Sequence, residues 1–325
     1  MTSHGKDMVV ERGRSDEANG GSSDLPVSLE DYFGFLRYDL PIVFEGISIN
    51  PLANHADIVA AINRVEHEDG FWYSPPSRRV ELDPHTHEPV RDVPNTERPA
   101  FLWKVPATHR LTVPTNLDRD AFRRETGLFV IHLLGYLFGT RLQFEHWWVD
   151  NRIPTKLQAR FVNAARVVEP FMSTCYQTWQ TWTPEERKSI AGLLYMHTRV
   201  PSYEWIWERF TFEYMVFDGL YALAAPRHGL PSRGNHSERI DRLCEALRIP
   251  TDASFVERIV QLRNNLFHQL TFGDQAPGFG GHNDVYVLPY RLRDLNRRII
   301  AGLLGWDVPF VHSGWWHLDI VPFDL

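Results

Sequence analysis

Residues 251–270 read TDASFVERIVQLRNNLFHQL, and their apolar side chains recur at the spacing of an amphipathic helix. One arc of the helical wheel holds Phe255, Val256, Ile259, Val260, Leu262, Leu266, Phe267 and Leu270. Asn264 and His268 are four residues apart and lie together beside this arc. Arg263 falls inside the arc, where a permanent charge needs a carboxylate, a phosphate or a second subunit as its partner. The segment therefore predicts a packed helix that gathers a guanidinium, an amide and an imidazole at one apolar seam.

Helical patterns dominate the chain from about residue 155 onward. Thr183-Pro184-Glu185-Glu186 combines a capping threonine, a proline at the first helical position and a capping box, so it predicts a helix start. Further helices are expected over residues 203–225, 236–248, 252–270 and 291–304. We therefore expect an all-α bundle over residues 151–325.

The first half of the chain has a different character. Residues 1–27 are polar and predict a flexible tail. Residues 28–150 predict a mixed domain with strands at 42–49 and 101–105, and a helix from Asp118 to a glycine stop at Gly139. The proline-rich stretch 74–99 is expected to be a long exposed loop. The fold class is therefore α+β, with a strand-containing domain followed by a helical one.

Composition limits the classes of function. The formal net charge of −7 disfavours a protein that coats nucleic acid non-specifically, but it allows an enzyme that engages a few phosphates in a cleft. Two cysteines make no disulfide framework, and no apolar signal core or membrane-length apolar run is present. We expect a cytoplasmic protein without a membrane partner.

Arg263, Asn264 and His268 suit RNA cleavage without a metal or cofactor. A neutral histidine can take the proton from a ribose 2′-hydroxyl, whose oxygen then attacks the neighbouring phosphate. Arginine can stabilise the negative charge that develops on phosphorus through paired N–H donors. The amide can orient the substrate or the histidine. The expected product carries a 2′,3′-cyclic phosphate.

These residues also carry a resemblance to a known family. LRNNLFHQ resembles the signature of the HEPN superfamily, in which a polar residue follows an arginine and a histidine comes after four to six positions. Residues 207–210 (WERF) and 218–221 (DGLY) resemble the preceding family helix, and 146–154 resembles the segment joining the two halves of ApeA-type members.

The resemblance implies several properties. It implies a helical bundle that forms a homodimer with a composite site, and an endoribonuclease of toxin or anti-phage systems with an antitoxin or a trigger ligand as a further partner. Asp218 stands where a glutamate is common in the family, and it is the expected acidic partner of Arg263. The N-terminal domain is expected to recognise the trigger or to restrain the nuclease.

Alternative interpretations remain for each motif. Arg141 and His146 repeat the spacing of Arg263 and His268, but they follow a helix end. A cluster of cations at 291–298 holds RNA backbone or forms a solvated helix face; its members are Arg291, Arg293, Arg297 and Arg298. His85 and His87 are more typical of a solvated loop than of a metal site. The alternative function is a non-catalytic HEPN module that dimerises and binds a nucleotide or a partner.

Overall fold

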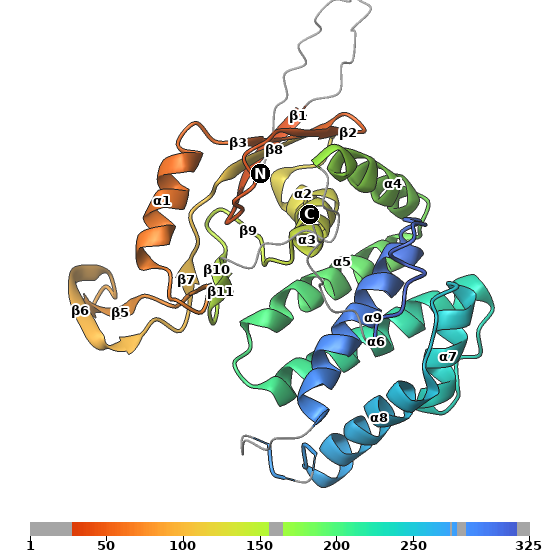
Figure 1. The fold of residues 1–325 in the computed structure, drawn as a ribbon. Coiled ribbons are helices and arrows are strands. Elements are labelled where there is room, and N and C mark those ends of the chain that lie inside the picture. The colour runs from red at the N-terminus through yellow and green to blue at the C-terminus, as the bar shows by residue number, and fades with distance from the viewer. Residues whose placement is uncertain (1–27, 156–164, 274, 278–283, 317–325) are drawn as a thin grey trace, which may run out of the picture.

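The computed structural model describes residues 28–155, 165–273, 275–277 and 284–316 (Figure 1). A strand-rich N-terminal region precedes a helical C-terminal region, as expected. The expected tail, residues 1–27, lies outside the described residues, and so does the end of the chain from residue 317.

A five-stranded antiparallel sheet, ordered β2-β3-β8-β1-β9, forms the framework of the N-terminal region. Its strands are β1 (Ser28–Gly34), β2 (Ile42–Phe44), β3 (Ile47–Pro51), β8 (His109–Pro114) and β9 (Gln143–Phe144). The stretch expected as one strand at 42–49 is a hairpin, because Glu45 and Gly46 adopt positive φ and reverse the chain. Smaller elements complete this region: α1 (His55–Val65), β4 (Phe71–Trp72), β7 (Trp103–Lys104), β10 (Trp148–Val149) and β11 (Ile153–Pro154).

The stretch expected as a loop at 74–99 is instead a two-stranded hairpin of β5 (Pro76–Leu82) and β6 (Pro89–Pro99), which projects from the molecule (Figure 1). The Asp83 carboxylate forms the turn by accepting the backbone N–H groups of His85 and Thr86, both at 2.8 Å. An ion pair joins Arg91 to Glu81 across the strands. The expected loop was therefore wrong, because an isolated ribbon has few neighbours and can accept prolines and charges.

The helix expected between Asp118 and Gly139 is confirmed, with a break. Asp118 Oδ1 accepts the N–H of Ala121 at 2.8 Å and begins α2 (Arg119–Arg124). Glu125 leaves helical geometry, after which α3 (Thr126–Phe138) begins. Gly139 ends α3 in the left-handed conformation that glycine adopts without strain. Nearly every residue of α3 is buried, which explains its apolar sequence.

Six α-helices form the C-terminal region within the residues that the structure describes. They are α4 (Val168–Gln180), α5 (Pro184–Arg199), α6 (Ile206–His228), α7 (His236–Ala246), α8 (Ala253–Asn264) and α9 (Leu288–Leu303). The long helix α6 contacts α5, α7 and α9, and α8 contacts α7 and α9. No helix in the described ranges is long and apolar enough to cross a membrane.

One hydrophobic core runs through both regions. It includes Phe33 of β1, Phe129 of α3, Phe217 of α6 and Leu295 of α9. In addition, β11 pairs with β4 of the N-terminal region, and α3 packs on α5. The packing thus continues across the boundary expected at residue 150.

The capping box at the start of α5 is confirmed. Thr183 Oγ1 accepts the Glu186 N–H at 3.3 Å, and Glu186 Oε2 accepts the Thr183 N–H at 2.9 Å. We expect Thr183→Ala to lower the free energy of unfolding by about 1 kcal/mol, because the Glu186 N–H at the helix start loses its acceptor, Thr183 Oγ1. Urea unfolding checks this value, with Ser189→Ala on the exposed face of α5 as the control. Equal stability of wild type and Thr183→Ala would contradict it.

Candidate functional site

The segment that carries Arg263, Asn264 and His268 is α8 and the turn that follows it. Asp252 caps α8, because its Oδ1 accepts the N–H of Phe255 at 3.1 Å. Three residues along the helix, Val256, Ile259 and Leu262, are buried against the rest of the bundle. The expected helix is thereby confirmed, and its packing holds Arg263 in place near its C-terminal end.

After Asn264 the helix widens into a π turn over Asn265–Gln269. The Leu270 N–H bonds to the Asn265 carbonyl, five residues back, and Leu270 itself adopts a φ of 54°. The wider turn changes the faces on which later side chains lie. Phe267 and Leu270, expected in the buried arc, are therefore 43% and 73% exposed.

Arg263 makes its contacts inside this short segment. Its Nη1 donates to Asn264 Oδ1 at 3.1 Å and to His268 Nε2 at 3.0 Å. The guanidinium carbon also lies 5.0 Å from the centre of the Phe267 ring and 6.0 Å from that of Tyr214 on α6. Its Nε is buried without a hydrogen-bond partner among the described residues. One N–H donor of this half-buried cation is therefore unsatisfied among the described residues.

The contact between Arg263 and His268 determines which nitrogen of the His268 imidazole carries the proton. A guanidinium can only donate, so His268 Nε2 must accept with its lone pair. His268 in this arrangement is therefore neutral, with its proton on Nδ1. This is the form that a general base requires, although the lone pair is engaged by Arg263 until that contact opens.

Asp218 does not take the position that the sequence suggested. Its carboxylate forms an ion pair at 3.0 Å with Arg239 on α7, not with Arg263. Arg239 in turn lies over the ring of Tyr221, with 4.6 Å between guanidinium carbon and ring centre. The expected pairing was wrong because α7, which brings Arg239 beside α6, is distant from Asp218 in sequence.

Two neighbouring groups were missed by the sequence analysis. The hydroxyl of Tyr214 lies 2.8 Å from Nδ1 of His236, the first residue of α7. Burial raises the pKa of Tyr214, and the Asp218 carboxylate adds to the effect, so the hydroxyl keeps its proton. Burial lowers the pKa of His236, and the charge of Arg263 lowers it further. A second neutral imidazole therefore lies in the electrostatic neighbourhood of Arg263, and only the pairing of α6 with α7 reveals it.

The arginines at 291–298 on α9 mostly make contacts within the protein. Arg298 is 1% exposed and donates to the Ser313 carbonyl and hydroxyl, both at 2.9 Å. Its expected role as an RNA contact is therefore wrong. Arg291 and Arg297 are partly exposed and lie 3.7 and 3.3 Å from Asp294. They remain candidates for a weak phosphate contact.

The second arginine–histidine pair does not form a site. Arg141 is buried and its Nη1 lies 2.8 Å from Asp150 Oδ1, whereas His146 is exposed beside Glu145. No group of three histidine, cysteine or acidic residues in the described part of the chain is arranged to hold a metal ion.

No protein-family model, curated protein or solved structure matches this chain.

Proposed function

We propose that this protein is an endoribonuclease of HEPN type that cleaves RNA without a metal ion. The observation that carries the proposal is the 3.0 Å contact between Arg263 and His268, which puts a permanent cation beside a neutral imidazole on an exposed turn. Those are the two groups that cleavage through the ribose 2′-hydroxyl requires.

In the proposed reaction, His268 Nε2 takes the proton of the 2′-hydroxyl, and the 2′-oxygen forms a bond to phosphorus. The bond from phosphorus to the 5′-oxygen breaks, and that oxygen takes up a proton from solvent water. The products are a 2′,3′-cyclic phosphate and a 5′-hydroxyl. Arg263 stabilises the charge on the phosphoryl oxygens, and Asn264 orients the substrate or the histidine.

The resting contact between Arg263 and His268 fits this scheme. A phosphate competes for the guanidinium through its charge and through oxygens that accept the guanidinium N–H groups. When the guanidinium turns to the phosphate, the lone pair of His268 Nε2 is released for the 2′-hydroxyl. Substrate binding thus converts a neutral but occupied imidazole into an available base.

We further propose that the protein acts as a homodimer with both sites near the interface. Phe267 and Leu270 flank His268 and are 43% and 73% exposed. Large apolar side chains exposed beside a polar site are typical of an interface. The remaining parts of the proposal rest on the resemblance to HEPN proteins: a toxin or anti-phage role, and an N-terminal region that senses a trigger or restrains cleavage. A cytoplasmic setting agrees with the buried free thiols Cys175 and Cys244.

The first test is expression of wild type and His268→Ala in bacterial cells, followed by mapping of RNA ends. We expect growth arrest and new cyclic-phosphate ends with wild type, and a reduction of those ends by about 10²–10⁴-fold with His268→Ala, because general-base catalysis is lost. His146→Ala is the matched control, since it removes an exposed histidine from the second pair and should leave cleavage unchanged.

Two results would overturn the mechanism. One is a product with a 3′-hydroxyl, and the other is cleavage that requires magnesium. Identical, undamaged RNA with wild type and His268→Ala would favour the alternative, a HEPN module that dimerises and binds a nucleotide or a partner.

A further inference from the structure

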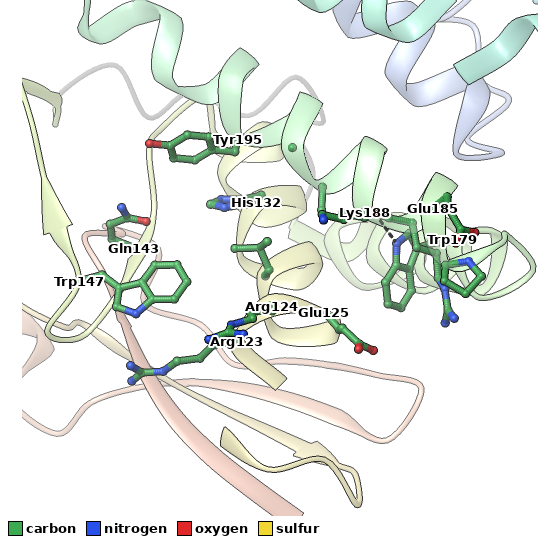
Figure 2. Close-up of a pocket in the computed structure, with 15 residues that line it drawn as sticks. Arg123, Arg124, Glu125, His132, Gln143, Trp147, Trp179, Glu185, Lys188 and Tyr195 are labelled. Carbon is green, nitrogen blue, oxygen red and sulfur yellow. Dashed lines mark hydrogen bonds between the residues drawn. The ribbon is translucent and has the colours of Figure 1, made fainter. Parts of the chain in front are cut away.

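A cavity of about 870 Å³ is lined by residues of α2, α3 and α5 (Figure 2). No residue of α8 or of the turn that carries His268 lines it. Figure 2 shows Tyr195, His132, Gln143 and Trp147 grouped along one side of α3, with Lys188 and Glu185 on its other side. The volume is within the range of small-molecule sites. Nothing in the proposed cleavage reaction uses this space.

Two buried polar groups at the cavity have no partner among the described residues: His132 Nδ1 and Gln143 Oε1. His132 is 1% exposed and Gln143 is 7% exposed. Gln143 Nε2 donates to the Trp148 carbonyl at 3.3 Å, which directs the amide oxygen away from that contact. Buried polar atoms are usually satisfied, so this pair indicates a ligand that offers hydrogen-bonding groups.

His132 remains uncharged here. Burial lowers its pKa to about 3, and the charge of Arg141 acts in the same direction. A neutral imidazole and an amide oxygen do not attract an anion. They suit the polar edge of an uncharged ring, in particular an amino group that donates to Gln143 Oε1.

The lining also includes charged residues, namely four cations and two carboxylates, Glu125 and Glu185. Arg123 is paired with Asp31 at 2.5 Å, and Arg187 lies over the Trp179 ring at 5.2 Å. Arg124 and Lys188 are exposed, and their side chains have no hydrogen bond or ion pair within the described ranges. These two cations are available to a phosphate.

Aromatic side chains complete the lining. Trp147 and Tyr195 are partly buried and line the cavity on the side of Gln143. The hydroxyl of Tyr195 accepts a hydrogen bond from Arg141 at 3.3 Å, which restrains the ring. Restrained aromatic rings are surfaces on which a planar base can stack.

We propose that this cavity binds a nucleotide whose base carries an amino group. The base lies against Trp147 and Tyr195 with its amino group toward Gln143 Oε1, and the phosphate lies between Arg124 and Lys188. The assignment is independent of RNA cleavage, because it uses none of the residues of the α8 site.

The test is titration of the full-length protein with AMP. Binding is measured by calorimetry and by the change in fluorescence of the cavity tryptophans. We expect saturable binding of AMP, at least tenfold weaker binding of adenosine, which lacks the phosphate, and weaker binding of IMP, which has an oxo group in place of the amino group. Arg124→Ala/Lys188→Ala should weaken AMP binding at least tenfold. Both residues are exposed, so the variant should unfold at the same urea concentration as wild type.

The matched control is Arg64→Ala, which removes an exposed cation from α1 and should leave AMP affinity unchanged. Absence of binding of AMP, CMP and GMP at millimolar concentration would overturn the proposal. So would equal AMP affinity in wild type and Arg124→Ala/Lys188→Ala, because the nucleotide would then bind elsewhere. Pyrophosphate binding as tight as that of AMP would overturn the assignment of a base to the aromatic side.

Discussion

Replacing Arg263 by lysine is expected to slow RNA cleavage by about 10²–10³-fold, although the charge is retained. A lysine ammonium is a point charge and cannot present the paired, planar N–H donors that match two phosphoryl oxygens. It also loses the Nε–H that has no partner among the described residues. The loss should appear in the single-turnover cleavage rate, measured with a short RNA at saturating protein.

Arg258→Lys is the matched control for this prediction. Arg258 lies on the same helix and over an aromatic ring, 5.1 Å from the centre of Phe255, but it is separate from the turn that carries His268. Its replacement should leave the cleavage rate within twofold of wild type. Cleavage by Arg263→Lys at the wild-type rate would remove Arg263 from the mechanism, provided that the two proteins unfold at the same urea concentration.

Substitution of Glu213, which is fully buried in α6, is expected to have a large effect on the stability of the fold. Its carboxylate lies 2.5 Å from Arg293 Nη1, accepts Asn296 Nδ2 at 2.8 Å, and lies 3.0 Å from His197 Nδ1. Burial alone would raise the pKa of Glu213, but the neighbouring His197 and Arg293 lower it to about 2. Glu213 is therefore ionised, and it joins α6 to both α5 and α9.

We expect Glu213→Gln to lower the free energy of unfolding by about 3–5 kcal/mol, because it leaves the Arg293 cation buried without its counter-charge. Urea unfolding followed by circular dichroism measures the change. Glu257→Gln is the control, since it neutralises an exposed carboxylate on α8 and should change stability by less than about 0.5 kcal/mol.

A double variant separates the unpaired charge from other effects of the substitution. Glu213→Gln/Arg293→Met removes both charges, and it should recover part of the stability lost in Glu213→Gln. Wild-type stability of Glu213→Gln would show that the buried pair contributes little. A double variant less stable than Glu213→Gln would show that Arg293 stabilises the fold through contacts other than its charge.

Local sequence patterns were sufficient for most of the helical region. The capping residues Asp118 and Thr183 and the stop at Gly139 act on neighbours within a few positions, so their effects can be predicted from spacing alone. The apolar period of residues 251–270 likewise predicted α8 and brought Arg263 and Asn264 onto it, but it did not predict the π turn that exposes Phe267 and Leu270. The sequence also predicted that His268 lies near Arg263, because the two residues are only five positions apart.

Only the tertiary structure decided which groups these side chains meet. Asp218 pairs with Arg239 because α7 packs on α6, and His236 reaches Tyr214 for the same reason. Arg298 is buried because the segment after α9 folds back and supplies the Ser313 carbonyl. Helical period cannot specify such partners, because they depend on how elements distant in sequence pack together. The sequence by itself determined which helix carries Arg263 and His268, and long-range packing determined their surroundings.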